Sequence, residues 1–469
     1  MNVRIGCAAL AATLIAIGLM ALRPAESTGG ALRDFGVFRA AGETRLDGRD
    51  PYSAAIAAHE NALPRGAMMP FVGMPPALPF WLALARLPEP AANALWRSLL
   101  IFALLALTVG STMLARVRAP FDFLCVALAA LAFTPITSAI ALGQTALAGA
   151  AAAALALALR TPAALTAGSF VALAFQPNAA LGLFAAFRRG ARWLALGIAA
   201  LYACGAIVRG PRWPLFYAHL LAAQSAAERD SVLQFTPAAI AAGFGASAPA
   251  AHAIAIAAAV VAAAAAIVLA WRARDQRFGF VAISCALPFA CGYFHGHDFA
   301  ALFAPAMIVL RGVHARLRGA ALAATVAIGA NWLDFAQAPH AYAQDVVLGC
   351  ALIAVCLAIL PRIDARVMLV AVASVALVAI AAWLGTTHPI PNWPDDFPGL
   401  AGRGAGTAAV VWHAELAATG LLSPNPVSAL LRCIPLAGCA LLFALLARAS
   451  DVDVHEVVER RDAVGVEAL

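Results

Sequence analysis

Lysine is absent from this sequence, and charge of either sign is scarce. Charged residues make up 12% of the 469 positions, against about 25% in a typical soluble domain. All 31 basic residues other than histidine are therefore arginine, and 63% of the chain is hydrophobic. Because so few charged groups cannot cover the surface of a soluble protein of this length, the composition predicts an integral membrane protein.

Motifs of the common soluble enzymes and metal proteins are also missing. The sequence contains no P-loop, no GxSxG and no HExxH pattern. The nine cysteines all lie in apolar runs and form no CxxC pair, which argues against a disulfide framework or a zinc site with cysteine ligands. The net charge of +7 comes from arginines between the apolar runs, so we expect no nucleic-acid partner.

Long hydrophobic runs are what the sequence has instead, many of them about 17 to 25 residues long, enough to cross a bilayer. They must be helical, because lipid cannot satisfy the polar groups of an open backbone. The first run is predicted to be an uncleaved anchor, with a signal peptide as the alternative. The runs are 3–22, 94–115, 119–139, 142–159, 162–187, 191–208, 249–271, 278–294, 298–311, 319–334, 345–361, 367–384 and 428–448.

Arginine clusters between these runs set the predicted topology, since basic loops stay in the cytoplasm. To keep every cluster inside, the proline-bounded segment 75–88 must lie at the outer interface as a juxtamembrane helix. For the same reason the run 162–187 must break at Pro177 into two short helices. We therefore expect an all-α polytopic membrane protein with about 12–14 transmembrane segments and both termini cytoplasmic. Residues 1–449 form a single domain and 450–469 a charged, mobile tail.

Polar residues that face outward in this topology are the candidates for chemistry. They lie in four regions, 23–93, 210–248, 294–298 and 385–427, and in shorter outer turns. In the first region Asp34 opens "DFGVFRAAGETRL", which is typical of an amphipathic helix on the membrane surface. A carboxylate there can act as a general base, and the alternative is a helix N-cap.

Arginines and a turn surround Asp34 in the sequence. Arg33, Arg39 and Arg49 can bind phosphate through their forked donors, or pair with nearby carboxylates and lipid phosphates. The stretch "GRDPYS", which contains Asp50 and Tyr52, is typical of a turn. Asp50 can alternatively orient an acceptor hydroxyl.

Three amides interrupt apolar sequence on the outer side: Gln144, Gln176 and Asn178. Polar groups at such positions are often functional, and hydrogen bonding between helices is the alternative. A further candidate is the turn "CGYFHGHDF".

This turn carries His295, His297 and Asp298 close together in the sequence. Three interpretations remain open for it. The side chains can contact substrate, ligate a metal, or pack at the membrane interface.

The order of these motifs resembles the glycosyltransferase 87 family, bacterial membrane enzymes of the GT-C fold that use polyprenyl-phosphate sugars. "DFGVFRAAGETRLDGRDPYS" is similar to the family's Asp-Phe, its aromatic and alanine helix, and its Gly-x-Asp-Pro-Tyr. "FVGMPPALPFWLALARLPEPAANALW" resembles its Tyr-Pro-Pro, Leu-Pro and Leu-Trp segment. "LGQTALAG" resembles its Gly-Gln helix start, and "TAGSFVALAFQPNAALGLFAAFRR" its broken helix. The resemblance covers about residues 30 to 195.

The resemblance implies a GT-C-like helical bundle and a specific reaction. Asp34 is the implied general base of an inverting transfer of a mannose- or arabinose-type sugar. The donor is a polyprenyl-phosphate sugar in the membrane, and the acceptor is a hydroxyl of a lipid or glycan. The reaction takes place on the periplasmic side of the bacterial inner membrane. No cofactor or metal ligand is predicted, and because the donor's bond to the sugar is already activated, a metal is not obligatory.

Departures from the family pattern leave alternatives. Gln176 stands where family members often have lysine, so phosphate binding falls to Arg39 or another outer arginine. The alternatives are a divergent inactive member of the family and a transporter or flippase of a lipid-linked glycan.

Overall fold

A computed structural model describes residues 2–20, 32–52, 56–57, 68–330, 332–333, 342–390 and 407–466. These residues are almost entirely helical. Within them the strands are β1 (Ile56–Ala57) and β2 (Met68–Met69), an antiparallel pair. The helices are α1 (Asn2–Met20), α2 (Arg33–Leu46), η1 (Pro75–Ala77), α3 (Leu78–Ala85), α4 (Glu89–Leu114), α5 (Pro120–Ala132), α6 (Thr134–Leu142), α7 (Ala146–Leu159), α8 (Pro162–Phe175), α9 (Pro177–Ala180), η2 (Leu181–Ala186), α10 (Phe187–Arg209), α11 (Trp213–Glu228), α12 (Pro237–Gly243), α13 (Ala248–Arg272), α14 (Gln276–Ala290), η3 (Gly296–Leu302), α15 (Phe303–Gly312), η4 (Ala315–Leu317), α16 (Arg318–Gly329), α17 (Tyr342–Ile359), α18 (Ala365–Thr387), α19 (Ala408–Ala418) and α20 (Pro426–Val466).

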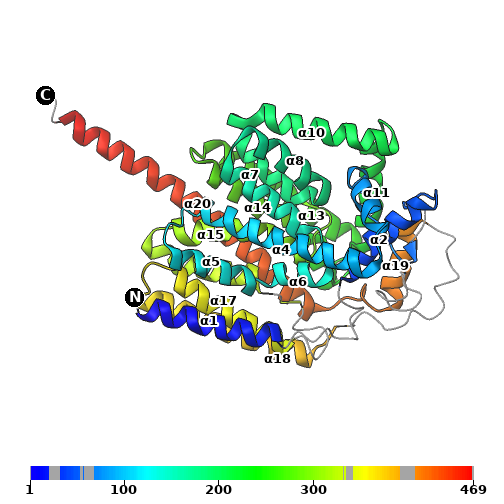
Figure 1. Cartoon of the computed structure of the whole chain (residues 1–469). Coiled ribbons are helices and arrows are strands. Elements are labelled where there is room, and N and C mark those ends of the chain that lie inside the picture. Colours follow the sequence, from blue (N-terminus) through cyan, green and yellow to red (C-terminus); the bar gives the residue numbers. More distant parts are fainter. Residues whose placement is uncertain are drawn as a thin grey trace.

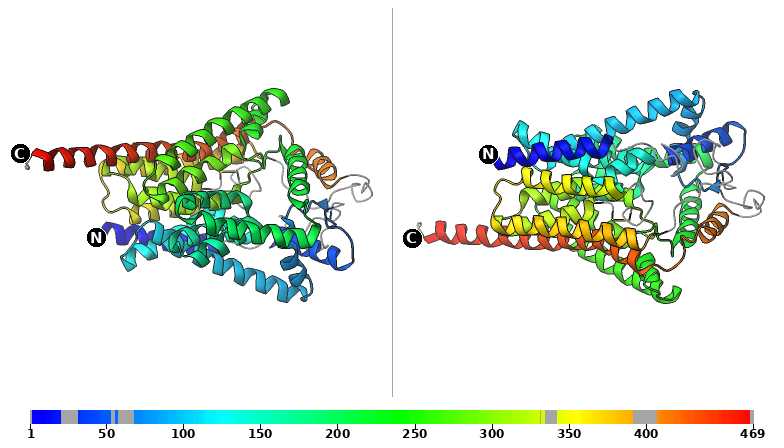
Figure 2. Two further views of the ribbon diagram at one scale, coloured as in Figure 1. Left: turned by 90° about the horizontal axis from the view of Figure 1, so that it is seen from above. Right: turned by 90° about the horizontal axis from the view of Figure 1, so that it is seen from below.

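The long helices run side by side in one bundle (Figure 1). The N-terminus and the C-terminal part of α20 lie at one end of it, which we call the termini end (Figure 2). Helices α2, α11 and α19 lie at the opposite, distal end. α1 packs along α17 and contacts α5, so the first hydrophobic run is a packed element of the bundle.

Several helices are suited to a membrane, as the composition predicted. Five stretches are long and apolar enough to cross one, and a pair bent by 57°, Pro120–Ala132 with Thr134–Leu142, makes up to six. The five are Glu89–Leu114, Pro177–Arg209, Ala248–Arg272, Ala365–Thr387 and Pro426–Arg448. Other apolar helices have 10–17 residues. The described part of the chain is therefore a helical membrane protein, and the number of 12–14 crossings stays a prediction.

The predicted break in the run 162–187 is confirmed, but its second half is not a short helix. From Pro177 the chain continues through α9, η2 and α10 to Arg209 as one 33-residue stretch, so the run 191–208 is not a separate helix. α8 ends at Phe175, and Gln176 leaves the helical conformation with φ −150° and ψ 83° before the chain turns back into helix. Pro177 is the cause, because its ring disfavours helical geometry in the preceding residue. The segment 75–88 also contains the expected short helix, formed by η1 and α3, which packs against α2.

Ion pairs join helix ends at the termini end. Arg4 and Arg311 both contact Asp122, and Arg116 and Arg277 both contact Asp275, with N···O distances of 3.1 Å for Arg311, 3.3 Å for Arg116 and 2.7 Å for Arg277. These arginines belong to segments far apart in the sequence. The predicted topology places the basic segments between the apolar runs on one side of the membrane, and these contacts lie together at one end of the bundle.

Candidate functional site

Aromatic packing fixes α2 at the distal end of the bundle. Phe35 stacks on Trp96 with ring centroids 5.5 Å apart, and Phe38 stacks on Trp81 at 4.7 Å. Trp81 and Trp96 come from α3 and α4, and both are buried. This contact turns the first residues of α2 inward, so that Asp34 is only 4% exposed.

Asp34 is held by two donors. Arg33 donates from Nε to Oδ1 at 2.8 Å, and Gln144 donates from Nε2 to Oδ2 at 2.5 Å. Burial raises the pKa of Asp34, but the Arg33 guanidinium, His297 and the Gln144 amide outweigh it and hold the pKa below its usual value. Asp34 is therefore an ionised carboxylate in a buried position.

The alternative reading of Asp34 as a helix N-cap is wrong. Leu32 occupies the N-cap position with φ 65°, and no side chain caps the helix there. Asp34 is instead the second residue of α2, and its oxygens accept from side chains rather than from the backbone of the first turn. A negative charge in this turn is still favoured by the helix dipole.

A left-handed glycine places Gln144 beside Asp34. Gly143 ends α6 with φ 74°, and its carbonyl accepts a hydrogen bond from Trp96 Nε1 at 3.0 Å. A Cβ atom at this position would lie 2.7 Å from the Cβ of Phe35. Glycine is needed both for the backbone conformation and for the close approach of α2.

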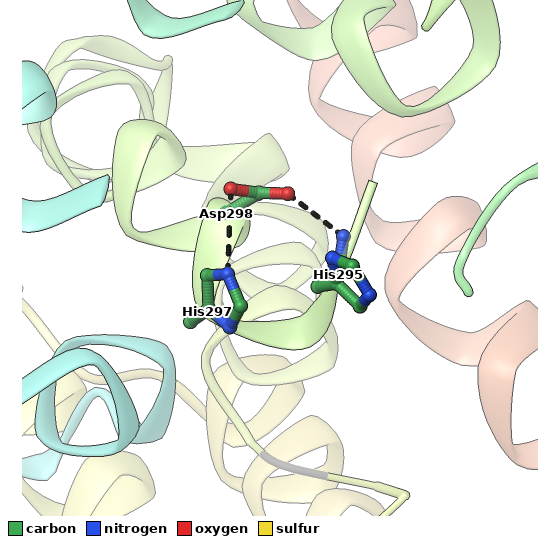
Figure 3. Close-up of side chains that lie close together, drawn as sticks. All are labelled: His295, His297 and Asp298. Atoms are coloured by element: carbon green, nitrogen blue, oxygen red, sulfur yellow. Dashed lines mark hydrogen bonds and ion pairs between the residues drawn. The ribbon is translucent and has the colours of Figure 1, made fainter. Parts of the chain in front are cut away.

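The predicted turn at 294–298 meets the break after α8. Gln176 Nε2 donates to Asp298 Oδ1 at 2.6 Å, and the backbone N–H of His295 donates to Asp298 Oδ2 at 2.8 Å. His297 Nε2 lies 3.8 Å from Asp298 Oδ1 (Figure 3). Asn178 makes a longer contact, from Nδ2 to the carbonyl of Tyr293 at 3.4 Å.

Glu228, which sequence reasoning missed, is the centre of a second set of contacts. This last residue of α11 is 2% exposed. It accepts from Gln224 at 2.7 Å, Gln234 at 2.5 Å and Trp412 Nε1 at 2.6 Å, and lies 3.0 Å from His295 Nε2. The sequence signal was an outward-facing helix in 210–248 with an amide and a carboxylate four residues apart.

The two histidines are shifted in opposite directions. Burial lowers the pKa of His295, but the carboxylates of Glu228, Asp298 and Asp34 outweigh it and raise the pKa. Burial lowers the pKa of His297. The carboxylates of Asp298 and Asp34 raise this pKa, but not enough to restore it to its usual value. Burial raises the pKa of Glu228, but His295 and the two glutamine donors hold it below its usual value. The surroundings of His295 thus favour its protonated form, whereas those of His297 favour the neutral imidazole.

We refer to these side chains together as the polar cluster. They are joined by hydrogen bonds and ion pairs, and between Asp34 and His297 by electrostatic interaction. Its members are Arg33, Asp34, Gln144, Gln176, Gln224, Glu228, Gln234, His295, His297 and Asp298. An ionised carboxylate and a neutral imidazole in one buried place can move a proton and hold a polar ligand.

Two of the predicted phosphate-binding arginines lie outside the polar cluster. Arg39 pairs with Glu43 at 3.0 Å and with Glu89 at 3.4 Å. Arg49 pairs with Asp47 at 2.8 Å, where its side chain is 70% exposed. The sequence left open that these arginines pair with nearby carboxylates, and both Arg39 and Arg49 do so.

The predicted turn "GRDPYS" is confirmed. Gly48 has φ 76°, and Asp50 Oδ1 accepts from the backbone N–H of Tyr52 at 3.1 Å. Asp50 also pairs with Arg209 at 2.9 Å, and the Tyr52 hydroxyl donates to the carbonyl of Gly73 at 2.9 Å. These contacts tie the first outer region to α10 and to the segment before α3, so Asp50 and Tyr52 serve the architecture around the polar cluster.

Comparison with protein-family models, with curated proteins and with solved structures found no match to this chain. The assignment of a function therefore depends on the geometry of the polar cluster.

Proposed function

We propose that this protein is a membrane glycosyltransferase. It moves a mannose- or arabinose-type sugar from a polyprenyl-phosphate donor to a hydroxyl of a lipid or glycan acceptor, with inversion. The distal end of the bundle faces the periplasm of a bacterium with the protein in its inner membrane. The observation that supports this most is Asp34, an ionised, buried carboxylate oriented by Gln144 at the end of a helical membrane bundle.

Asp34 is the general base of the proposed reaction. Its carboxylate removes the proton of the acceptor hydroxyl as that oxygen attacks the anomeric carbon from the face opposite the phosphate. The bond between this carbon and the phosphate oxygen breaks, and the lipid phosphate leaves with the electron pair. The sugar configuration inverts because attack and departure occur on opposite faces.

Arg33, His295 and His297 supply the positive and hydrogen-bonding groups near Asp34. Arg33 contacts Asp34, whereas Arg39 and Arg49 pair with other carboxylates. Arg33 is therefore the best candidate among the three arginines for the donor phosphate. The two imidazoles offer N–H donors and nitrogen acceptors, which suits hydrogen bonds to phosphate and sugar oxygens.

Transport of a lipid-linked glycan is less well supported. A transporter of this kind is expected to have its polar binding groups near the middle of the membrane. The polar cluster is instead built from helix ends: the start of α2, the residues before α7, the end of α8, the end of α11 and the start of η3.

The substitution Asp34→Asn tests the assignment. Full-length protein in lipid nanodiscs is incubated with labelled polyprenyl-phosphate sugars and membrane acceptors, and transfer is measured. General base catalysis contributes roughly 10²–10⁴-fold, so Asp34→Asn should lower the rate at least about 100-fold. The matched control is Asp47→Asn, which removes an exposed carboxylate of the same region and should change the rate less than about twofold. A folded Asp34→Asn protein that transfers sugar at the wild-type rate would show that Asp34 is not the base.

A further inference from the structure

Three possible metal-ligand atoms of the polar cluster lie near one another in the turn at 295–298. One atom each from His295, His297 and Asp298 lies within 4.8 Å of the others (Figure 3). Two imidazole nitrogens and one carboxylate oxygen are a common ligand set for catalytic zinc, which keeps a fourth position open. We propose that these three residues bind a divalent transition-metal cation, with zinc as the best fit.

The geometry needs a small adjustment to close around a cation. Ligand atoms about 2.0–2.2 Å from zinc in a tetrahedron are about 3.4 Å from each other. The most distant pair must therefore approach by about 1.4 Å from the separation of 4.8 Å. The imidazole rings of His295 and His297 are nearly parallel, at 18°, with centroids 5.3 Å apart, so a shift of the His297 ring toward His295 closes the gap while His295 keeps its contact with Glu228.

The surroundings of His295 fit a metal ligand. Oε1 of Gln234 accepts a hydrogen bond from the backbone N–H of Phe294 at 2.8 Å, which directs the Gln234 amide nitrogen toward Glu228. His295 Nε2 lies 3.0 Å from a Glu228 oxygen, where two lone pairs would repel, so we assign a proton to Nε2. In neutral His295 this leaves the Nδ1 lone pair for the metal. A carboxylate behind a ligating histidine is a recurrent arrangement in metal sites.

The carboxylate ligand is oriented in the same manner. Asp298 accepts from the side chain of Gln176 at 2.6 Å and from the backbone N–H of His295 at 2.8 Å. Each carboxylate oxygen has a second lone pair, so these bonds leave room for a metal. The side chain is 4% exposed and cannot turn away to solvent without losing both contacts.

The charge of the polar cluster independently favours a cation. It contains the carboxyl groups of Asp34, Glu228 and Asp298, which are 4%, 2% and 4% exposed, and these outnumber the Arg33 guanidinium even when His295 is protonated beside Glu228. Buried negative charge is costly unless it is paired. A divalent cation at the histidines offsets it, whereas an anionic ligand binding alone would add to it.

A role for the metal rests on the proposed function, but its binding does not. If the ligand is a lipid phosphate, the open metal position accepts a phosphate oxygen and stabilises the charge that develops as the phosphate leaves.

Metal binding is measured directly on the purified full-length protein. A purification tag without histidine is used, metals are removed with a chelator, and zinc or cobalt(II) is titrated in calorimetry, with the bound metal counted by elemental analysis. We expect one tightly bound ion per chain in the wild type and at least 100-fold weaker binding in His297→Gln. His219→Gln, at an exposed histidine of α11, is the control and should bind like the wild type.

Two further variants separate this inference from the proposed function. Glu228→Gln removes the carboxylate behind His295 and should weaken binding about 10- to 100-fold. Asp34→Asn should bind the metal like the wild type even though its sugar transfer is at least about 100-fold slower. Binding that depends on His297 in a protein without transfer activity supports the metal site and argues against the transferase. A wild type that binds neither ion, or His297→Gln that binds equally well, overturns the metal site.

Discussion

Replacing Glu228 by glutamine removes a buried charge while it preserves the shape of the side chain. In the wild type the carboxylate faces four groups within 3.0 Å: Gln224 at 2.7 Å, Gln234 at 2.5 Å, Trp412 at 2.6 Å and His295 at 3.0 Å. The glutamine amide has one oxygen to accept from them. Its NH₂ group would face donors in place of the second oxygen.

The expected loss of stability follows from these contacts. A hydrogen bond to a charged group contributes about 1.5–3 kcal/mol, and removing one partner of a buried ion pair costs about 3–5 kcal/mol. Because Glu228 is 2% exposed, solvent does not reduce these values appreciably. We expect Glu228→Gln to lower the free energy of unfolding by about 3–5 kcal/mol.

Unfolding of the detergent-solubilised protein, followed by tryptophan fluorescence in the presence of a chelator, measures this loss without a contribution from metal. Tyr293→Phe is the matched control, since the tyrosine hydroxyl contacts the same carboxylate at a longer 3.4 Å. It should cost less than about 1 kcal/mol. If Glu228→Gln is within about 1 kcal/mol of the wild type, the reasoning from buried charge is refuted.

Two other predictions concern the site and its pH dependence. A Cβ at Gly149 would lie 2.3 Å from the Cβ of Gln176, so Gly149→Ala should displace Gln176, lower the free energy of unfolding by about 1–3 kcal/mol and slow sugar transfer. Gly6→Ala, where the added atom meets nothing within 4 Å, is its control, and equal effects of the two would contradict the packing argument. Because the pKa of Asp34 is depressed in the folded state, its contribution to stability is present above the unfolded pKa and is lost as the pH falls through the folded pKa. The stability difference between wild type and Asp34→Asn, measured by unfolding at several pH values, should be constant from about pH 7 to 5 and shrink below about pH 4, and a difference that grows on acidification would contradict it.

Local sequence features predicted the parts of the structure that depend on local physics. The shortage of charge predicted a helical membrane protein, because burial in lipid requires apolar side chains and internally satisfied backbone groups. Pro177 predicted the break after α8, since a proline restricts its neighbour whatever the rest of the chain does. "GRDPYS" predicted its turn for the same kind of reason.

The membership of the polar cluster was decided by tertiary structure. Asp34 and Gln144 are 110 residues apart, Gln176 and Asp298 are 122 apart, and Glu228 and Trp412 are 184 apart. Asp34, Gln144, Gln176 and Asp298 could be recognised in the sequence as candidate polar residues, whereas Glu228 and Trp412 were overlooked. For none of these side chains does the sequence indicate the partner.

The arginines also show that the sequence does not indicate which candidate residues meet in the folded protein. Arg33, Arg39 and Arg49 are chemically equal candidates for phosphate in the sequence, yet only Arg33 contacts Asp34 among the three. The sequence by itself determined that the chain folds as membrane helices and that one of them ends just before Pro177, because apolar length and proline act along the chain. Only the packing of α2 against Trp81 and Trp96 decided which charges meet, because ion pairing depends on distance in space.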